Sequence, residues 1–355
     1  MLNCPKLGVK GLLEMPKHCP TADLDEDVDV LPSHAVRIPL PLPLKDLRVV
    51  YVYAVLGEDG VTLVDSGWAD EASEAVLVES LNRLGFTPAD VRRIVVTHTH
   101  WDHFSRAIDW QRRYGTKVLI GRQEHHSIEA FDERTGAYPV QAQLLVGAGA
   151  PELAQTIAEL QLEPFEQHVP FGPPDVWLND GDEIDCGGVV LVARATPGHT
   201  RGHMVYEDRV GNLAFTGDHI LPRITPSIAL ERAPEVLPLR SYLASLQLFL
   251  DGPDASMLPA HGAVTPSVRT RAEALLEHHR DRLDRVGELV ASGCSTAYAV
   301  SKRMLWTRHE RTVDELGAVH GMTAILEVVA HLELLVARGL LTRVKSGLVN
   351  HYAVS

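Results

Sequence analysis

The sequence is poor in cysteine and has no long apolar segment. Its four cysteines are scattered, without a CxxC pair, at Cys4, Cys19, Cys186 and Cys294. This spacing argues against a disulfide framework and a cysteine-type zinc site, so we expect free thiols in a reducing compartment. No run approaches the roughly 18 apolar residues of a membrane helix, and no basic start with a following apolar segment opens the chain. We therefore expect a cytoplasmic protein that does not enter a membrane.

Basic charge is also scarce. The 355 residues carry a formal net charge of −14. The acidic excess lies in residues 1–264, whereas residues 265–355 are slightly basic. Because an acidic main body repels polyanions, the composition argues against binding of long nucleic acid.

Motifs for a covalent nucleophile are missing as well. The chain has no G-x-S-x-G elbow and no cysteine in a catalytic setting. Ser66, within Asp65-Ser66-Gly67, is better explained by a turn after a strand. We therefore do not expect a serine or cysteine hydrolase.

The sequence does contain a dense histidine motif, His-x-His-x-Asp-His, directly after the apolar run of residues 91–96. His98 and His100 are two positions apart, so on an extended chain they project to the same side and can reach one cation. Asp102 and His103 follow closely and suit a second cation. Mixed nitrogen and oxygen ligands are typical of zinc, manganese or iron. The motif therefore predicts a metal site.

Three further apolar segments end in residues that can bind metal. His199 follows the β-branched run of residues 189–193, Asp218 follows residues 212–217, and His261 follows residues 257–260. With the histidine motif, four expected strands thus end in possible ligands. Strands alternating with helices imply an α/β architecture whose chemistry lies at strand ends.

The remaining pattern predicts the following elements. Residues 36–44 are expected as an edge strand or an extended cover because of their prolines, and residues 48–56 and 61–65 as a hairpin. Short strands are expected at residues 117–121, 176–178 and 183–185, and helices at residues 71–84 and 104–114.

Two regions interrupt this α/β series. Residues from about 123 to 167 are mainly helical in pattern, so we interpret them as an insertion that could cover the site. Beyond residue 265, helical patterns at residues 269–291, 295–305 and 322–337 precede an alternating segment from Leu341 to Ala353, as in a winged helix. The predicted domains are therefore 1–264 and 265–355.

The ordered motifs resemble the metallo-β-lactamase fold superfamily, in particular the branch of glyoxalase II, lactonases and β-lactamase-like endoribonucleases. The resemblance covers residues 50–262 and implies a four-layer αβ/βα sandwich, while residues 265–355 resemble the winged-helix appendage of the endoribonucleases. It implies that His98, His100 and His199 hold one cation, and that Asp102, His103 and His261 hold a second. Asp218 would bridge the two cations, and Asp65 would orient a ligand histidine.

Two zinc ions per chain are the implied cofactors, with iron or manganese possible. Two such cations lower the pKa of a water between them toward about 7, which provides a metal-bridging hydroxide at neutral pH. Asp102 and Asp218 are the candidate catalytic residues, since Asp102 could also steer the proton of the nucleophile. The leading interpretation is hydrolysis of a small-molecule ester, thioester or lactone.

Three alternatives remain open at this point. The winged-helix pattern admits an endoribonuclease or phosphodiesterase, although the acidic body argues against long RNA. A mono-iron dioxygenase acting on sulfur compounds would rely on the positions of His98, His199 and Asp218. The third alternative is a regulator whose metal is structural. The helix over residues 322–338 has acidic residues opposite its apolar face, which favours packing or homodimerisation over nucleic-acid reading.

Other residues near the motifs are weaker candidates. His203 and His219 could orient ligands or contact the substrate, or could serve structural hydrogen bonds. Arg223 could bind an anionic group of the substrate or could lie on the surface. The pairs His125-His126 and His278-His279 are expected to be exposed, because neighbours on a helix diverge by about 100° and do not converge on one ion.

Overall fold

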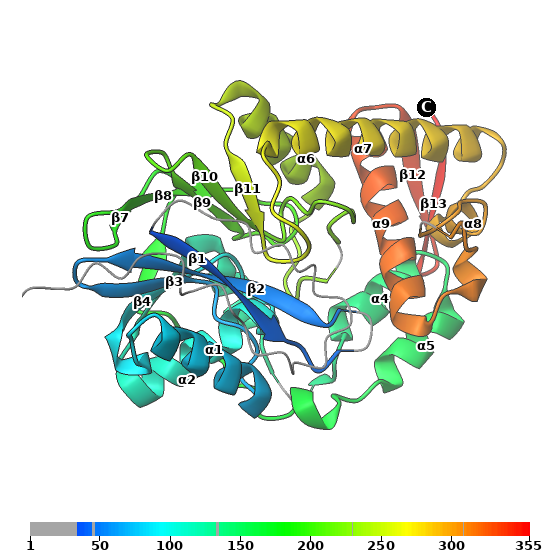
Figure 1. Ribbon diagram of the computed structural model, residues 1–355. Coiled ribbons are helices and arrows are strands. Elements are labelled where there is room, and N and C mark those ends of the chain that lie inside the picture. Colours follow the sequence, from blue (N-terminus) through cyan, green and yellow to red (C-terminus); the bar gives the residue numbers. More distant parts are fainter. Residues whose placement is uncertain (1–33, 45–46, 133–134, 229, 308) are drawn as a thin grey trace, which may run out of the picture.

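The computed structural model describes residues 34–44, 47–132, 135–228, 230–307 and 309–355. Residues 1–33 of the predicted first domain lie outside this part. Two large sheets face one another, and helices lie outside them and beside them (Figure 1).

The first sheet has six strands in the order β1-β2-β3-β4-β5-β6. Strands β1 to β3 pair antiparallel, and β3 to β6 pair parallel. The strand bounds are β1 Ala35–Pro41, β2 Val49–Gly57, β3 Gly60–Val64, β4 Val91–Val96, β5 Lys117–Gly121 and β6 Val176–Leu178. The proline-rich β1 is an edge strand and β2 forms a hairpin with β3, so both predictions are confirmed.

The second sheet has five strands in the order β11-β10-β9-β8-β7. Its strands pair antiparallel except for β10 and β11, which are parallel. The strand bounds are β7 Glu183–Asp185, β8 Val190–Ala195, β9 Met204–Asp208, β10 Leu213–Gly217 and β11 Ser256–Pro259.

Alternating side chains along the strands build a layered core. In β2, Val50 and Val52 pack with the apolar cluster that includes helices α1 (Glu71–Arg83) and α2 (Trp101–Tyr114), whereas Tyr53 packs with residues of the second sheet. This alternation follows from the two-residue period of a strand. The second sheet behaves likewise, because Phe215 faces the first sheet and Ala214 faces the cluster that contains α6 and α7.

The result is a helix–sheet–sheet–helix sandwich of four layers. Helices α1 and α2 cover the outer face of the first sheet, as Figure 1 shows. Helices α6 (Pro238–Asp251) and α7 (Val268–Ala291) share an apolar cluster with the outer face of the second sheet. The four layers confirm the predicted α/β sandwich.

The segment interpreted as an insertion is helical, with α3 at His125–Glu129, α4 at Pro139–Gly147, α5 at Pro151–Glu159 and a 3-10 turn at Pro164–Glu166. Helices α4 and α5 pack against α9 (Ala318–Ala337). The later elements are α8 (Ala297–Ser301), a 3-10 turn at Val313–Glu315, and the hairpin of β12 (Leu341–Ser346) and β13 (Val349–Val354). The order of helices and hairpin is the expected one, while the winged-helix assignment and the boundary at residue 265 stay predictions.

Helix α9 is the one described helix that is long and apolar enough to cross a membrane. It is buried between α4, α5, α6 and α7 in an apolar cluster that joins all of these helices. Its composition is therefore accounted for by core packing.

Two local expectations differ from the structure. Helix α2 begins at Trp101 instead of residue 104, because His100 is extended and caps the helix. His279 is buried, not exposed as expected, since its ring packs between Tyr242 of α6 and His331 of α9. His125, His126 and His278 are partly exposed.

Candidate metal centre

The end of β4 supplies four of the expected ligands. His98 and His100 lie in the short connection between β4 and α2, and Asp102 and His103 lie in the first turn of α2. Because an N-terminal helix turn favours negative charge, it is a suitable position for Asp102. One strand end and one helix start therefore direct all four side chains to the same edge of the first sheet.

The second sheet supplies the other three. His199 follows β8, Asp218 comes directly after β10, and His261 comes two residues after β11. The two sheets approach closely here, since a Cβ at Gly217 would lie 2.7 Å from Thr97 Cβ. Gly217 also has a φ of 50°, so both the space and the backbone favour glycine at this position.

The first donor group contains His98, His100, His199 and Asp218. Its ligand atoms all lie within 4.8 Å of one another. His98 Nε2 is 2.9 Å from His100 Nδ1, and His199 Nε2 is 3.2 Å from the same His100 atom. These three nitrogens therefore surround one small volume.

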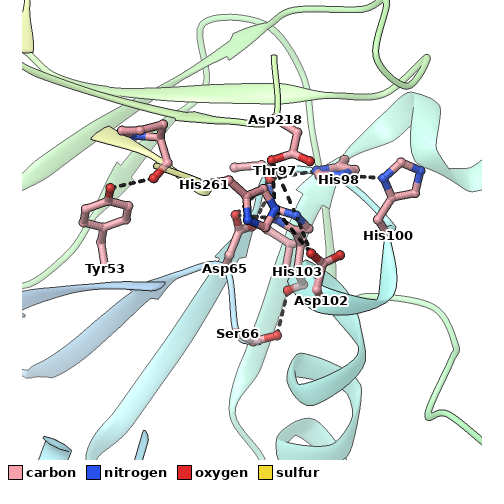
Figure 2. A network of polar contacts seen from close by, with 12 residues as sticks. Tyr53, Asp65, Ser66, Thr97, His98, His100, Asp102, His103, Asp218 and His261 are labelled. Atoms are coloured by element: carbon pink, nitrogen blue, oxygen red, sulfur yellow. Dashed lines mark hydrogen bonds and ion pairs between the residues drawn. The ribbon is translucent and has the colours of Figure 1, made fainter. Parts of the chain in front are cut away.

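The second donor group contains Asp102, His103 and His261, again with ligand atoms within 4.8 Å of one another. The Nε2 atoms of His103 and His261 lie 3.5 Å and 3.4 Å from Asp102 Oδ2. Figure 2 shows these side chains converging with Asp218.

Asp218 lies between the two donor groups. Its Oδ2 is 3.8 Å from His199 Nε2, and its Oδ1 is 3.4 Å from His261 Nε2. The structure thus gathers all seven residues singled out in the sequence into two adjacent groups, divided as the resemblance implies. It places Asp218 where a carboxylate could contact a cation in either group.

Several polar atoms of the centre have no hydrogen-bond partner among the described residues. They are buried, and they include His103 Nε2, His261 Nε2 and Asp218 Oδ1. Unpaired buried polar atoms cost about 1–3 kcal/mol each, so a native fold rarely keeps several together. A divalent cation would satisfy them, and the mixed nitrogen and oxygen donors suit zinc, iron or manganese.

The opposite ring nitrogens of four of the five histidines are hydrogen-bonded by the protein, whereas His100 Nε2, opposite the Nδ1 atom in the first donor group, has no partner among the described residues. Nδ1 of His98 is 3.0 Å from Thr97 Oγ1, and Nδ1 of His103 is 2.8 Å from Asp65 Oδ2. Main-chain carbonyls accept from two more rings: Ser227 O lies 2.5 Å from His199 Nδ1, and Val49 O lies 2.8 Å from His261 Nδ1. Such bonds fix the orientation of these rings and direct Nε2 toward the candidate cation site.

Asp65 makes the contact with a candidate ligand histidine that the resemblance leads us to expect. Besides His103, its carboxylate accepts from the backbone N–H of Thr97 at 2.7 Å and from the Thr97 hydroxyl at 3.0 Å. Asp65 is buried and has a φ of 61°. The turn after β3 therefore connects the start of the histidine motif to one of its last members.

Burial keeps the histidines of the first donor group neutral. Loss of contact with water lowers the pKa of His98 well below its usual value and lowers the pKa of His100 to about 3. Burial also lowers the pKa of His199. Since neutral imidazole is the form that binds a cation, this group is ready to act as ligands.

Carboxylates dominate the electrostatics of the second donor group. Burial alone would lower the pKa of His103, but the negative charges around it, Asp102 first among them, raise that pKa to about 10. Burial would raise the pKa of Asp218, but neighbouring histidines, His261 first, lower it. Asp102 and Asp218 thus make the electrostatic potential in the second donor group negative, and this potential favours binding of a cation.

The weaker candidates lie in different places. His203 is buried, its Nδ1 is 2.9 Å from Thr196 Oγ1, and its ring stacks on His98. His219 is buried against Tyr242 and Phe249, and its two ring nitrogens have no hydrogen-bond partner in the described chain. Arg223 is exposed.

The sequence did not reveal three groups that form hydrogen bonds with the candidate ligands or with residues next to them. Two are the carbonyls of Val49 and Ser227, which no side-chain motif reveals. The third is Glu124, a buried residue that contacts Thr99 and Thr200. The only indication of Glu124 in the sequence is its position shortly after the expected strand of residues 117–121. A single acidic residue at such a position is ordinarily assigned to the surface.

Three known proteins are similar to this chain over most of its length. A probable metallo-hydrolase of Bacillus subtilis is 25% identical over 341 residues, covering 87% of this chain and 93% of that protein. The crystal structure of a beta-lactamase domain protein from Burkholderia ambifaria has a TM-score of 0.76 at 26% identity, covering 92% and 94%. A metallo-beta-lactamase family protein from Thermus thermophilus has a TM-score of 0.72 at 25% identity, covering 91% and 99%.

Partial matches carry more specific names. An atrochrysone carboxyl ACP thioesterase of Aspergillus fumigatus is 28% identical over 140 residues, which are 39% of this chain and 31% of that protein. A hydroxyacylglutathione hydrolase of Chelativorans sp. is 21% identical over 166 residues, or 47% of each chain.

The family model described as the metallo-beta-lactamase superfamily matches residues 46–274, which contain all seven gathered side chains and most of both sheets. With the four layers, the paired donor groups and this match in agreement, the chain belongs to the metallo-beta-lactamase superfamily.

Proposed function

We propose that this metal-dependent hydrolase binds two zinc ions and cleaves a small ester, thioester or lactone. His98, His100 and His199 would hold one ion, Asp102, His103 and His261 would hold the other, and Asp218 would contact both. The main support for this proposal is that two adjacent donor groups contain buried donor atoms without hydrogen-bond partners among the described residues.

Two bound zinc ions would supply hydroxide at neutral pH and would polarise the oxygen under attack. The protein's own contribution is position and charge. Asp102 Oδ2 lies 3.5 Å from His103 Nε2 and 3.4 Å from His261 Nε2, so its carboxylate is fixed within the second donor group, where it could accept a proton from the nucleophile. Most of the seven candidate ligands are buried, and electrostatic stabilisation of developing charge is stronger in such a site than in water.

The names of the relatives support the substrate class. One is named a thioesterase and another a hydrolase of hydroxyacylglutathione, and both act on acyl compounds by name. Phosphodiester cleavage and iron-dependent oxidation of a sulfur compound are the other outcomes to test. The acidic net charge argues against a long RNA substrate.

Metal analysis of the purified protein is the first test. We expect about two zinc ions per chain, and one iron or no metal would contradict the proposal. Activity would then be screened on p-nitrophenyl esters, acyl-thioesters, lactones and bis-phosphodiesters, with and without a chelator. We expect acyl hydrolysis that a chelator abolishes and that zinc restores.

Variants sharpen this screen. Asp218→Asn should lose most of the acyl hydrolysis, because the central carboxylate would no longer carry full charge toward both ions. Arg223→Ala is the matched control, since the arginine is exposed a few residues further along the same loop. Unchanged hydrolysis in Asp218→Asn would argue against two cooperating ions, while unchanged kinetics in Arg223→Ala on anionic substrates would dispose of a substrate-binding role for Arg223.

A further inference from the structure

We propose that Glu124 is a positioning residue that clamps together the two loops carrying the first cation's ligands. The inference rests on the proposed function, because it concerns the same metal centre. Glu124 is the last residue of the 3-10 turn Arg122–Glu124, directly after β5, and it is fully buried. A buried carboxylate is costly unless it is fully hydrogen-bonded, so its partners identify its role.

Those partners are threonines within the two ligand segments. The Thr99 hydroxyl donates to Glu124 Oε2 at 2.5 Å, and the Thr200 hydroxyl donates to Glu124 Oε1. Thr99 stands between His98 and His100, and Thr200 directly follows His199. One carboxylate therefore joins the segments that supply all three histidines of the first donor group.

The surroundings leave little freedom for this contact. A Cβ at Gly202 would lie 2.2 Å from Glu124 N, and a Cβ at Gly121 would lie 2.1 Å from Gly202 O. The backbone N–H groups of Thr99 and Gly202 also bond to the Glu124 carboxylate. The loop after His199 is thus packed directly on the turn after β5, with the carboxylate between them.

The second donor group is held differently. His103 is bonded to Asp65, and His261 is bonded to the Val49 carbonyl. No hydrogen bond of the described chain joins Glu124 to Asp102, His103 or His261. Loss of the clamp should therefore weaken the first cation site selectively, and removal of an outer partner of metal ligands typically costs ten- to a hundredfold in metal affinity.

The test compares Glu124→Gln with Asp208→Asn. Asp208 is a buried acid at the end of β9 that accepts from the backbone N–H groups of Val210 and Gly211 and contacts neither ligand segment, so its change to the amide is the matched control. Zinc affinities would be measured by competition with a chromophoric chelator, and the cobalt-loaded proteins by visible absorption. We expect Glu124→Gln to weaken one of two zinc sites about tenfold or more and to alter the cobalt spectrum, and Asp208→Asn to change neither.

A second pair of variants keeps the test decisive if Glu124→Gln does not fold. Thr200→Val removes the hydroxyl that donates to the carboxylate, whereas Thr200→Ser retains it, so only the valine variant should weaken one zinc site. Wild-type affinities in Glu124→Gln and Thr200→Val would overturn the clamp, as would equal weakening in Asp208→Asn or equal loss from both sites. Absence of zinc binding by the wild type would instead overturn the proposed function.

Discussion

Asp65 shows how much one side chain contributes to the centre. Its two carboxylate oxygens accept from His103, from the Thr97 hydroxyl and from the Thr97 backbone, and it does so from a backbone with a φ of 61°. Asn tolerates this left-handed conformation about as well as Asp, so the charge can be removed without backbone strain.

Asp65→Asn should therefore keep the fold and lose function. The neutral amide is a weaker acceptor for His103 Nδ1–H, so we expect a ten- to hundredfold fall in zinc affinity or in kcat/KM. Zinc competition and steady-state kinetics are the measurements, with circular dichroism to verify the fold. Asp59→Asn, at an exposed position in the turn between β2 and β3, should leave both quantities unchanged.

At the residue scale, ligands were predictable where they are side chains at the ends of strands. Asp218 and His261 each directly follow an apolar run that predicts a strand, so both could be recognised as candidate ligands from the sequence alone. The acceptors Val49 O and Ser227 O were not predictable, because any residue type offers a carbonyl. His279 was misjudged because its partner, His331, comes from a helix 52 residues away.

Among the elements, α6 and β9 were not predicted. Helix α6 did carry a signal: Pro238 at its first turn, then buried apolar residues at Leu239, Tyr242 and Leu246. Strand β9 has five residues with few cues of its own, and it exists because β8 and β10 pair with it on both sides. Long periodic elements are thus readable from sequence, whereas short ones depend on their neighbours.

Helices α7 and α9 meet at a buried histidine pair, with 3.2 Å between His279 Nδ1 and His331 Nε2. Burial lowers the pKa of His279 to about 2 and the pKa of His331 to about 4. The charge of nearby Arg282 also lowers the pKa of both histidines, and His278 also lowers the pKa of His279. The pair is therefore neutral in the folded protein at neutral pH.

This pair should make the fold sensitive to acid. The unfolded chain binds protons on both histidines below pH about 6.5, while the folded chain does not, so stability is full above that pH and falls as the pH drops from 6.5 toward 4. Each histidine contributes a slope of up to about 1.4 kcal/mol per pH unit. Denaturant unfolding of His331→Leu across this range should show a shallower slope than the wild type. His320→Leu, exposed at the start of the same helix, should keep the wild-type slope.

For the whole molecule, the main observation is that one apolar cluster crosses the predicted boundary at residue 265. Met257 of β11 and Leu246 of α6 lie in the same cluster as Leu275 of α7 and Ile325 of α9. The boundary was predicted from a change in composition. Composition does not indicate which helices and strands pack against one another.

A chain ending at residue 264 should therefore fold poorly. Removing α7 and α9 would expose the apolar sides of α4, α5 and α6, and each buried leucine contributes about 1.5–3 kcal/mol. We expect aggregation, or a far lower Tm, in solubility and thermal-unfolding measurements. A soluble truncation with a wild-type Tm would show instead that the chain up to residue 264 folds independently of residues 265–355.

The two sheets share the metal ligands between them, and this division fixes when the centre can be completed. The ribosome makes His98 to His103 first, but His199, Asp218 and His261 emerge only after most of the chain has been synthesised. We therefore expect a nascent chain shorter than 261 residues, which holds only part of the candidate donor set, to retain a cation weakly. Stable metal binding would then follow translation of the second sheet.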